Sequence, residues 1–330
     1  MTVENATTIG YIGLGLAGGP MAENIPKKGF KLIVRDANKE RENWFLANNT
    51  VNTERAGEGR DAFKDVDILI TMLPNGHIVR DVLLGENGVA PFLKPACLVV
   101  DTSSSDPFGT KQLEDDLSQY KVRLIDSPVT QVRMHGLNDG EACFMLGGQK
   151  EDIDYALPVL KTMCRWWFHM GPIGSGHVMK TFNNYTTGAA IAALNDCFMV
   201  GAKMGLDPAM ITEVLNVGTG RNYGTAHSFR AEALTRTYNS GYGLALLVKD
   251  LGINRDLMKK VNVDSRLADL VWDNWNEALQ DEDIEKSADY TKALMHWENK
   301  AEIKLPTYVD LEEEEEPRAE FTGAPDFKTI

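Results

Sequence analysis

The sequence predicts an α/β protein with two folded parts, an N-terminal doubly wound domain on a mostly parallel sheet and an all-α C-terminal domain. Two observations lead to this fold class. In the first half, short apolar runs alternate with helical patterns, which is typical of parallel strands with helices on both faces. Beyond Gly176, helical patterns follow one another without a strand-like run. We therefore expect domains at residues 1–170 and 171–305, followed by an acidic tail at 306–330.

The first predicted strand covers residues 9–12 and leads directly into a glycine-rich turn. Gly13, Gly15 and Gly18 have the spacing G-x-G-x-x-G, which is typical of a Rossmann dinucleotide-binding domain. The three glycines allow a tight turn, close approach of a diphosphate and close packing of the next helix, whose N-terminus faces the anion. Because glycines also cluster in ordinary strand-to-helix turns, the pattern needs support from its context. The residues of this turn expected to bind the cofactor are Gly13, Leu14, Gly15, Leu16, Ala17 and Gly18.

A helix over residues 21–28, ended by Gly29, and a second strand over 31–34 complete a βαβ unit. Further strand-like apolar runs recur at 66–73, 97–100, 122–125 and 142–146. The following domain begins with a helix over 177–204, whose apolar and small residues suit a buried helix.

Asp36 follows the second strand, 18 residues after Gly18. At this position a carboxylate accepts hydrogen bonds from the ribose 2′-hydroxyl of the cofactor and repels a 2′-phosphate. The sequence therefore predicts NAD rather than NADP. Two alternatives stay open, since Asp36 could serve only as a turn residue and Arg35 or Lys39 could stabilise a phosphate.

The composition limits the class of protein and its partners. At 330 residues, with 43% hydrophobic and 25% charged residues, the chain can form two soluble globular domains. A net charge of -14 argues against nucleic acid or an anionic membrane as a partner. Part of that charge is an acidic run at 312–316, typical of a solvated tail.

The cysteines and the chain start favour a cytoplasmic protein. The four cysteines are widely spaced among apolar residues, so we expect buried reduced thiols rather than disulfides or zinc ligands. The polar start has no signal-peptide pattern, and no stretch is apolar enough to span a membrane. The cysteines are Cys97, Cys143, Cys164 and Cys197.

The segment GPIGSGHVMKTFNN, residues 171–184, contains the strongest candidates for chemistry. On a helix, Lys180 lies on the same face as Asn183 and Asn184, at spacings of three and four residues. Desolvation would lower the pKa of the lysine toward the range in which it exchanges a proton with an alcohol near neutral pH. The alternative is a surface lysine whose charged end reaches solvent.

Several separate segments together resemble the β-hydroxyacid dehydrogenase family, which includes 3-hydroxyisobutyrate dehydrogenase, tartronate semialdehyde reductase and, more distantly, 6-phosphogluconate dehydrogenase. The similarity extends from Ile9 to about Gly252 and excludes the tail. The matching segments are GLGLAGGPMAENI at Gly13, MLPN at Met72, DTSSSDP at Asp101, DSPV at Asp126, GSGHVMKTFNN at Gly174 and VKDLG at Val248.

The resemblance implies a role for each matched residue. In the family motif KxxNN, the lysine is the general acid/base and the second asparagine binds substrate, which here are Lys180 and Asn184. Lys249, which precedes DLG, would complete the site from the second domain, although a solvated ion pair with Asp250 is its alternative. The positions that the resemblance places beside the cofactor are Leu73, Pro74, Ser103 and Lys249.

The substrate-carboxylate loop departs from the family pattern. Where the family has DxPVSGGxxGAxxG, this chain has DSPVTQVRMHGLNDG. Thr130 keeps the hydroxyl, while Gln131 and Val132 replace two glycines. Backbone N–H groups could still bind a carboxylate, but side chains now occupy space that the family leaves open. We expect Thr130, Gln131, Val132 and Asn184 to contact the substrate, and we expect either a different loop path or a different substrate.

The function predicted from these residues is hydride transfer between NAD and the carbinol carbon of a small 3-hydroxy acid, with Lys180 as acid/base and no metal. The partners expected are a small carboxylic acid and further copies of the chain, as a homodimer or homotetramer through the helical domain. An imine reductase is one alternative, although such enzymes generally lack the lysine. A catalytically silent dinucleotide-binding protein is the other, favoured by the altered loop.

Overall fold

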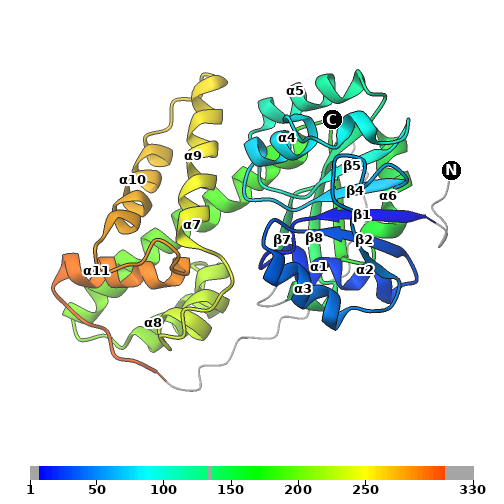
Figure 1. The fold of residues 1–330 in the computed structure, drawn as a ribbon. Helices are drawn as coiled ribbons and strands as arrows, with labels where there is room; N and C mark the ends of the chain where they lie inside the picture. Colours follow the sequence, from blue (N-terminus) through cyan, green and yellow to red (C-terminus); the bar gives the residue numbers. More distant parts are fainter. Residues whose placement is uncertain (1–6, 132–135, 309–330) are drawn as a thin grey trace. The chain divides into compact units, whose positions relative to one another are not determined.

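The computed structural model of the protein describes residues 7–131 and 136–308, which form two compact units. The first unit, residues 7–180, contains a mostly parallel β-sheet with helices on both faces, and the second, residues 181–308, is helical (Figure 1). The predicted fold class is confirmed. The predicted domain limits stay a prediction, and the acidic tail lies outside the described residues.

The sheet of the first unit has the strand order β3-β2-β1-β4-β5-β6-β8-β7, and β9 also pairs with β8. The strands from β3 to β6 are parallel, whereas β8 runs antiparallel to β6 and β7 and parallel to β9. The order reverses direction at β1, and in open α/β sheets ligands bind beyond the carboxyl ends of the strands at such a point. The strands are β1 (Thr8–Ile12), β2 (Lys31–Arg35), β3 (Thr53–Arg55), β4 (Ile68–Thr71), β5 (Leu98–Asp101), β6 (Arg123–Asp126), β7 (Val129–Gln131), β8 (Ala142–Gly147) and β9 (Cys164–Gly171).

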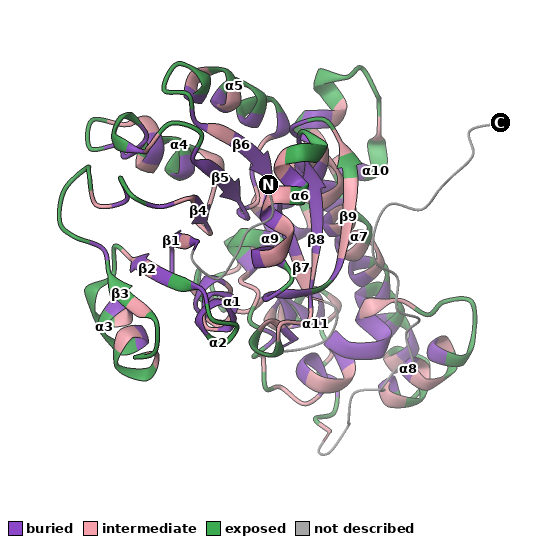
Figure 2. Ribbon diagram, turned by 90° about the vertical axis from the view of Figure 1, so that its right-hand side faces the viewer, coloured by how far each residue is buried: buried purple, intermediate pink, exposed green. Residues whose placement is uncertain are grey.

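The central strands are buried on both faces, as Figure 2 shows for β4 and β5. Side chains alternate between the faces along each strand, so Ile68 and Ile70 belong to one hydrophobic cluster and Leu69 to another. Helices α1, α2, α3 and α6 contribute to the first cluster, and α4 and α5 to the second. These helices are α1 (Gly18–Ala22), α2 (Asn24–Lys27), α3 (Lys39–Asn48), α4 (Gly76–Leu84), α5 (Pro107–Ser118) and α6 (Lys150–Leu160), with short 3₁₀ turns η1 (Ala90–Phe92) and η2 (Gly136–Asp139).

The single helix predicted over residues 21–28 was wrong in its form. The structure has two short helices there, and the interruption lies at Glu23. Pro26 has no backbone N–H, so it cannot donate to the carbonyl of Ala22 four residues earlier, and the helical ladder breaks. Gly29 ends the second helix with a φ of 92°, as a C-terminal glycine does.

Three strands, β3, β7 and β9, were missed by the sequence analysis. None has an apolar run as long as four residues, and each lies beside only one neighbour at the margin of the sheet. β3 is short and largely exposed, and β9 mixes buried Trp166 with exposed Arg165. Edge strands are commonly short and carry charged side chains, so they lack the apolar pattern used to find the others.

The second unit is built from helices around one hydrophobic cluster centred on the fully buried Trp275. Its first helix, α7 (Ser175–Lys203), is 29 residues long and continues from the first unit. Among the described residues after α7, the β-structure is one isolated bridge between Gly243 and Asp289. The other elements are α8 (Pro208–Val217), the π-helix η3 (Gly224–Ala233), α9 (Leu244–Lys260), α10 (Arg266–Gln280), η4 (Tyr290–Ala293) and α11 (Leu294–Ala301).

All four cysteines lie in the described part of the chain and are free thiols. Cys97 and Cys164 are buried and Cys143 is half-buried, but Cys197 is exposed on α7, so its predicted burial was wrong. Its helix is apolar on several sides, which hid the exposed face from the sequence pattern. Within the described ranges, no helix is both long and apolar enough to cross a membrane.

Candidate active site

The glycine-rich turn lies at the carboxyl end of β1, beside the end of β4. Gly13 has a φ of 104°, and a Cβ atom there would overlap the carbonyl oxygen of Met72. A Cβ on Gly18 would overlap the carbonyl oxygen of Gly13. Gly15 differs, because a Cβ there would meet only Arg41, at 3.9 Å from Nη1. The turn is therefore closely packed at its two ends and open at its centre, as a diphosphate requires.

Asp36 lies directly after β2 and contacts the same turn. Its Oδ2 accepts the backbone N–H of Leu14 at 2.6 Å, and its Oδ1 accepts the N–H of Asn38 at 2.7 Å. Each carboxylate oxygen keeps a further lone pair that could accept a ribose hydroxyl. From α3, Arg41 donates to the carbonyl of Leu14 at 3.3 Å, so both the backbone N–H and the carbonyl of Leu14 have side-chain partners.

The other two cations near this position have different partners. Arg35 donates to the carbonyls of Gly57 and Gly59 at 2.6 and 2.9 Å, and its guanidinium lies over the Phe63 ring. Lys39 pairs with Glu42 at 2.9 Å. Arg41, which the sequence analysis did not single out, lines a hollow of about 310 Å³ beside the turn instead.

The ends of β4 and β5 are joined through Leu73 and Ser103. The backbone N–H of Leu73 donates to the hydroxyl of the buried Ser103 at 2.9 Å. Asp101 accepts the N–H of Ser103 at 3.1 Å and the hydroxyl of Thr71 at 2.9 Å. Because β1, β2, β4 and β5 are parallel, their carboxyl ends lie along the same side of the sheet. The predicted cofactor positions that follow these strands therefore lie together there.

The remaining predicted cofactor residues differ in exposure. Leu14 is buried, Ala17 is half-buried, and Leu16 and Pro74 are exposed. Exposed apolar side chains on that side of the sheet are available to a bound dinucleotide.

Thr130 and Lys180 both lie near Cys143. Thr130 is on β7 and pairs with Cys143 on β8, so the two side chains share one face of the sheet. Burial raises the pKa of the Cys143 thiol to about 11, and the nearby charge of Lys180 opposes that rise. Lys180 is half-buried in the second turn of α7. Gln131 is half-buried and pairs with Ala142, whereas Val132 lies outside the described residues.

In the second unit, Asn184 and Lys249 share one buried partner, Asp250. Asn184 Nδ2 donates to Asp250 Oδ2 at 2.6 Å and to the hydroxyl of Tyr242 at 3.1 Å. Lys249 Nζ lies 2.9 Å from Asp250 Oδ1. Burial, followed by the charge of Asp250, raises the pKa of Tyr242 well above its ordinary value, so the phenol stays protonated and donates to Asp250 at 2.6 Å.

These contacts orient the amide of Asn184. Both hydrogens of its Nδ2 face acceptors, so its Oδ1 is the atom left to meet a ligand, with one lone pair used by Asn183 at 3.0 Å. The sequence indicated Asp250 only as the partner of Lys249 in a solvated ion pair. The ion pair is present, but Asp250 is 3% exposed, so its carboxylate is not solvated. Tyr242 carries no sequence signal, since it lies outside the matched segments.

A glycine turn at the reversal point of a 3-2-1-4-5-6 sheet, with an acidic residue after the second strand, defines the class of this protein as a Rossmann-type dinucleotide-binding protein. Residues 8–171 match the family described as the NAD-binding domain of 6-phosphogluconate dehydrogenase. Residues 174–297 match the NAD-binding family of NADP-dependent 3-hydroxyisobutyrate dehydrogenase. The chain belongs to the β-hydroxyacid dehydrogenase family and is an NAD(P)-dependent dehydrogenase.

Individual relatives show how much of the chain this likeness covers. A probable mitochondrial 3-hydroxyisobutyrate dehydrogenase of Dictyostelium discoideum is 31% identical over 79% of this chain and 82% of its own length. The 2-(hydroxymethyl)glutarate dehydrogenase of Eubacterium barkeri is 29% identical over 79% and 85%. The 3-hydroxyisobutyrate dehydrogenase of Mycobacterium tuberculosis, solved with L-serine, shares the fold with a TM-score of 0.77, at 24% identity over 88% of this chain and 99% of that one.

Proposed function

We propose that the protein oxidises a small 3-hydroxy acid, or reduces the corresponding semialdehyde, with NAD as its cofactor. The observation that carries this proposal is the placement of Lys180 on α7, close to Cys143 and hence to the face of the sheet that bears Thr130. A lysine beside a hydroxyl and backbone donors suits proton exchange with an alcohol whose carboxylate is held nearby. Bound NAD would accept the hydride of the carbinol carbon.

Each side chain then has a separate task. Lys180, in its neutral form, takes the proton of the substrate hydroxyl during oxidation and returns it during reduction. Thr130 and the backbone of its loop donate to the carboxylate. Asn184 offers its Oδ1 as an acceptor, which suits a hydroxyl group better than a carboxylate.

The preference for NAD rests on Asp36. Its carboxylate is held at the turn by Leu14 and keeps acceptor positions for the ribose. Arg35 and Lys39 are engaged elsewhere, which removes two candidate partners for a 2′-phosphate. Arg41 is the cation that could still accept NADP, because it lies beside the same turn.

The substrate proposed here carries a further polar group beyond those of 3-hydroxyisobutyrate. Gln131 places an amide side chain on β7, at a position where the family pattern has glycine. The relative from Eubacterium barkeri is named for a substrate with a second carboxylate, so an enlarged acid has a precedent among similar proteins. Gln131 would hydrogen-bond this group.

We also propose a homodimer or homotetramer that forms through the helical unit. Six apolar side chains, at the end of α7, in the following turn and on α8, are 58 to 88% exposed, which is typical of a contact surface. They are Val200, Met204, Leu206, Met210, Val214 and Val217. A cytoplasmic location is proposed from the free cysteines, which suit a reducing compartment.

A panel of 3-hydroxy acids, screened for NAD reduction at fixed pH, tests the proposed reaction. Turnover of at least one acid, with NAD faster than NADP, is the expected result. Binding of NAD without reduction would favour the silent dinucleotide-binding protein. Reduction of cyclic imines without oxidation of any acid would favour the imine reductase.

A further inference from the structure

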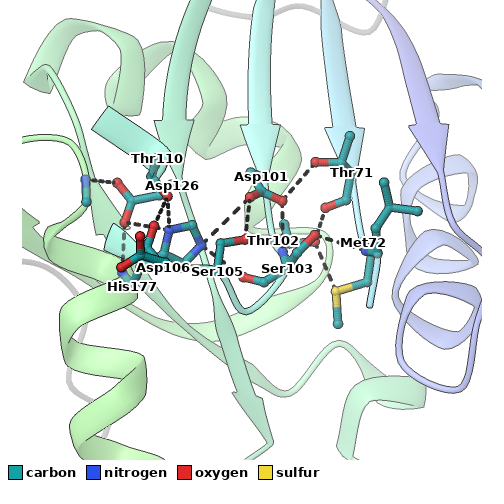
Figure 3. A network of polar contacts seen from close by, with 12 residues as sticks. Thr71, Met72, Asp101, Thr102, Ser103, Ser105, Asp106, Thr110, Asp126 and His177 are labelled. Atoms are coloured by element: carbon teal, nitrogen blue, oxygen red, sulfur yellow. Dashed lines mark hydrogen bonds and ion pairs between the residues drawn. The ribbon is translucent and has the colours of Figure 1, made fainter. Parts of the chain in front are cut away.

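His177 occupies a fully buried position in the first turn of α7, where three parts of the first unit meet. Its side chain is 0% exposed. Figure 3 shows the ring between Asp126 on one side and the segment of Ser103 and Asp101 on the other. Lys180 follows three residues later, one turn further along the same helix.

Both ring nitrogens of His177 have partners in other elements. Nε2 lies 3.0 Å from the carbonyl oxygen of Ser103, and since a carbonyl only accepts, Nε2 carries a hydrogen and donates. Nδ1 lies 2.8 Å from the hydroxyl of Thr110 on α5. The imidazole therefore links α7 to the segment after β5 and to the helix that follows it.

Two buried carboxylates complete the arrangement. Asp126 accepts the backbone N–H groups of Gly174 and His177 at 2.6 and 2.8 Å, which caps the start of α7. Asp101 accepts the N–H of Ser103, on the opposite side of the ring. Their nearer oxygens lie 3.8 Å from Nδ1 and Nε2 respectively.

Ser103 is thus held at three atoms, two of the backbone and one of the side chain. Its N–H bonds to Asp101, its carbonyl accepts from His177, and its hydroxyl accepts the N–H of Leu73. Of these contacts, the bond from His177 is the one made by the helix that carries Lys180.

We infer that His177 is a positioning residue that fixes the cofactor-lining segment of Leu73 and Ser103 relative to the helix turn of Lys180. This inference rests on the proposed function in one respect, that Lys180 is the acid/base. It adds a connection between the two halves of the reaction, the dinucleotide and the proton acceptor. Hydride transfer is sensitive to such placement, since a displacement of about 1 Å costs about 10²-fold in rate.

Replacement of His177 by Leu and by Gln separates placement from general stability. Leu fills the space but leaves the Ser103 carbonyl without its donor, whereas Gln restores an N–H donor and an amide oxygen acceptor. For His177→Leu we expect the Kd of NADH to rise about tenfold, from loss of a buried hydrogen bond, and kcat to fall about 10²-fold. For His177→Gln we expect both values to return to within about threefold of the wild type.

Cys97→Ala provides the matched control. Cys97 is a buried residue just before β5, at the end of that strand opposite Asp101, and its truncation weakens the same core. It should lower the Tm while leaving NADH affinity and kcat at wild-type values. If His177→Leu changed the Tm alone, as this control does, or if Gln failed to rescue, the inference would be overturned.

Two further arms keep the test decisive. Thr110→Val removes the partner of Nδ1, together with the bond of that hydroxyl to the carbonyl of Asp106 within α5. It should raise the Kd of NADH by a few fold, so it replaces His177→Leu should that variant not fold. Unchanged affinity would count against the inference. NADH binding, followed by its fluorescence, needs no hydroxy acid. A wild type that binds NADH but oxidises no acid therefore refutes the proposed function, while the binding comparison still tests His177.

Discussion

The carboxylate of Asp36 accepts the backbone N–H of Leu14 at 2.6 Å, across 22 residues of chain. The residue expected to read the ribose therefore also holds the glycine-rich turn in place. A change at Asp36 acts on the cofactor through its charge and through the shape of the turn. Variants that separate these two effects are needed to interpret cofactor preference.

Replacement of Asp36 by Ser should narrow the preference for NAD over NADP, because it removes both the ribose hydrogen bonds and the repulsion of a 2′-phosphate. Asp36→Asn removes the charge and keeps one acceptor oxygen, which can still accept the N–H of Leu14 while the N–H of Asn38 loses its partner, so it should stay closer to wild-type stability than Asp36→Ser. The measurement is kcat/KM with each cofactor, together with Tm. A wild-type preference for NADP would contradict the role of Asp36 and point to Arg41.

Removal of the Lys180 amine should lower kcat by about 10²- to 10⁴-fold, as expected for loss of an acid/base group. In Lys180→Ala the affinity for NAD, measured by titration, should change little. Lys203→Ala, in the last turn of the same helix, is the control and should keep full activity. Near-normal turnover in Lys180→Ala would contradict the proposed role of Lys180 as the acid/base.

The altered loop predicts an altered substrate. Wild type should turn over 3-hydroxyisobutyrate poorly, and Gln131→Gly should weaken the preferred acid more than the simple one, because a polar group of the substrate loses its partner. Gln131→Asn keeps the amide on a shorter side chain and serves as the intermediate case. The measurement is kcat/KM of the wild type and both variants across the acid panel. An unchanged substrate ranking would contradict the proposed role of Gln131.

Loss of the Asp250 carboxylate should lower kcat/KM more than loss of the Tyr242 hydroxyl, which donates a hydrogen bond to it. Asp250→Asn leaves Lys249 and Asn184 without their anionic partner, and we expect kcat/KM to fall about 10- to 100-fold, the range for hydrogen bonds to a charged group. Tyr242→Phe should lower kcat/KM by a smaller factor, since Asn184 keeps its hydrogen bond to the Asp250 carboxylate. Asp256→Asn, exposed on the same helix, is the control. Equal losses in the first two variants would refute this ordering.

The exposed apolar surface at the end of α7 and on α8 predicts self-association. Val214 is 61% exposed on α8, and Val214→Glu should shift the chain toward a monomer because a buried unpaired charge is costly at an interface. Val261→Glu, at the end of α9, should leave the assembly unchanged. Light scattering after size-exclusion chromatography measures both, and a monomeric wild type would contradict the proposal.

The sequence was most informative where a local pattern has a local cause. The glycines from Gly13 to Gly18 and the strand before them could be predicted, because the turn requires small residues at fixed spacings. Asp36 could be placed at a strand end for the same reason. Its bond to Leu14 could not be predicted, since it depends on how β2 pairs with β1.

The contacts that join distant segments had no sequence signal. Leu73 and Ser103 are 30 residues apart, and Asn184 and Asp250 are 66 apart. Motif resemblance indicated that some of these residues share a site but not which atoms meet. The orientation of the Asn184 amide is an example, because it follows from a buried carboxylate and a phenol on other segments.

The capping of α7 by Asp126 also has a consequence for the order of folding. The carboxylate that accepts the N–H groups of Gly174 and His177 lies 48 and 51 residues earlier in the chain, at the end of β6. An isolated peptide of α7 lacks this acceptor, so its first turn should fray in water. We therefore expect the first turn of α7, which precedes Lys180, to become ordered only after β6 has joined the sheet.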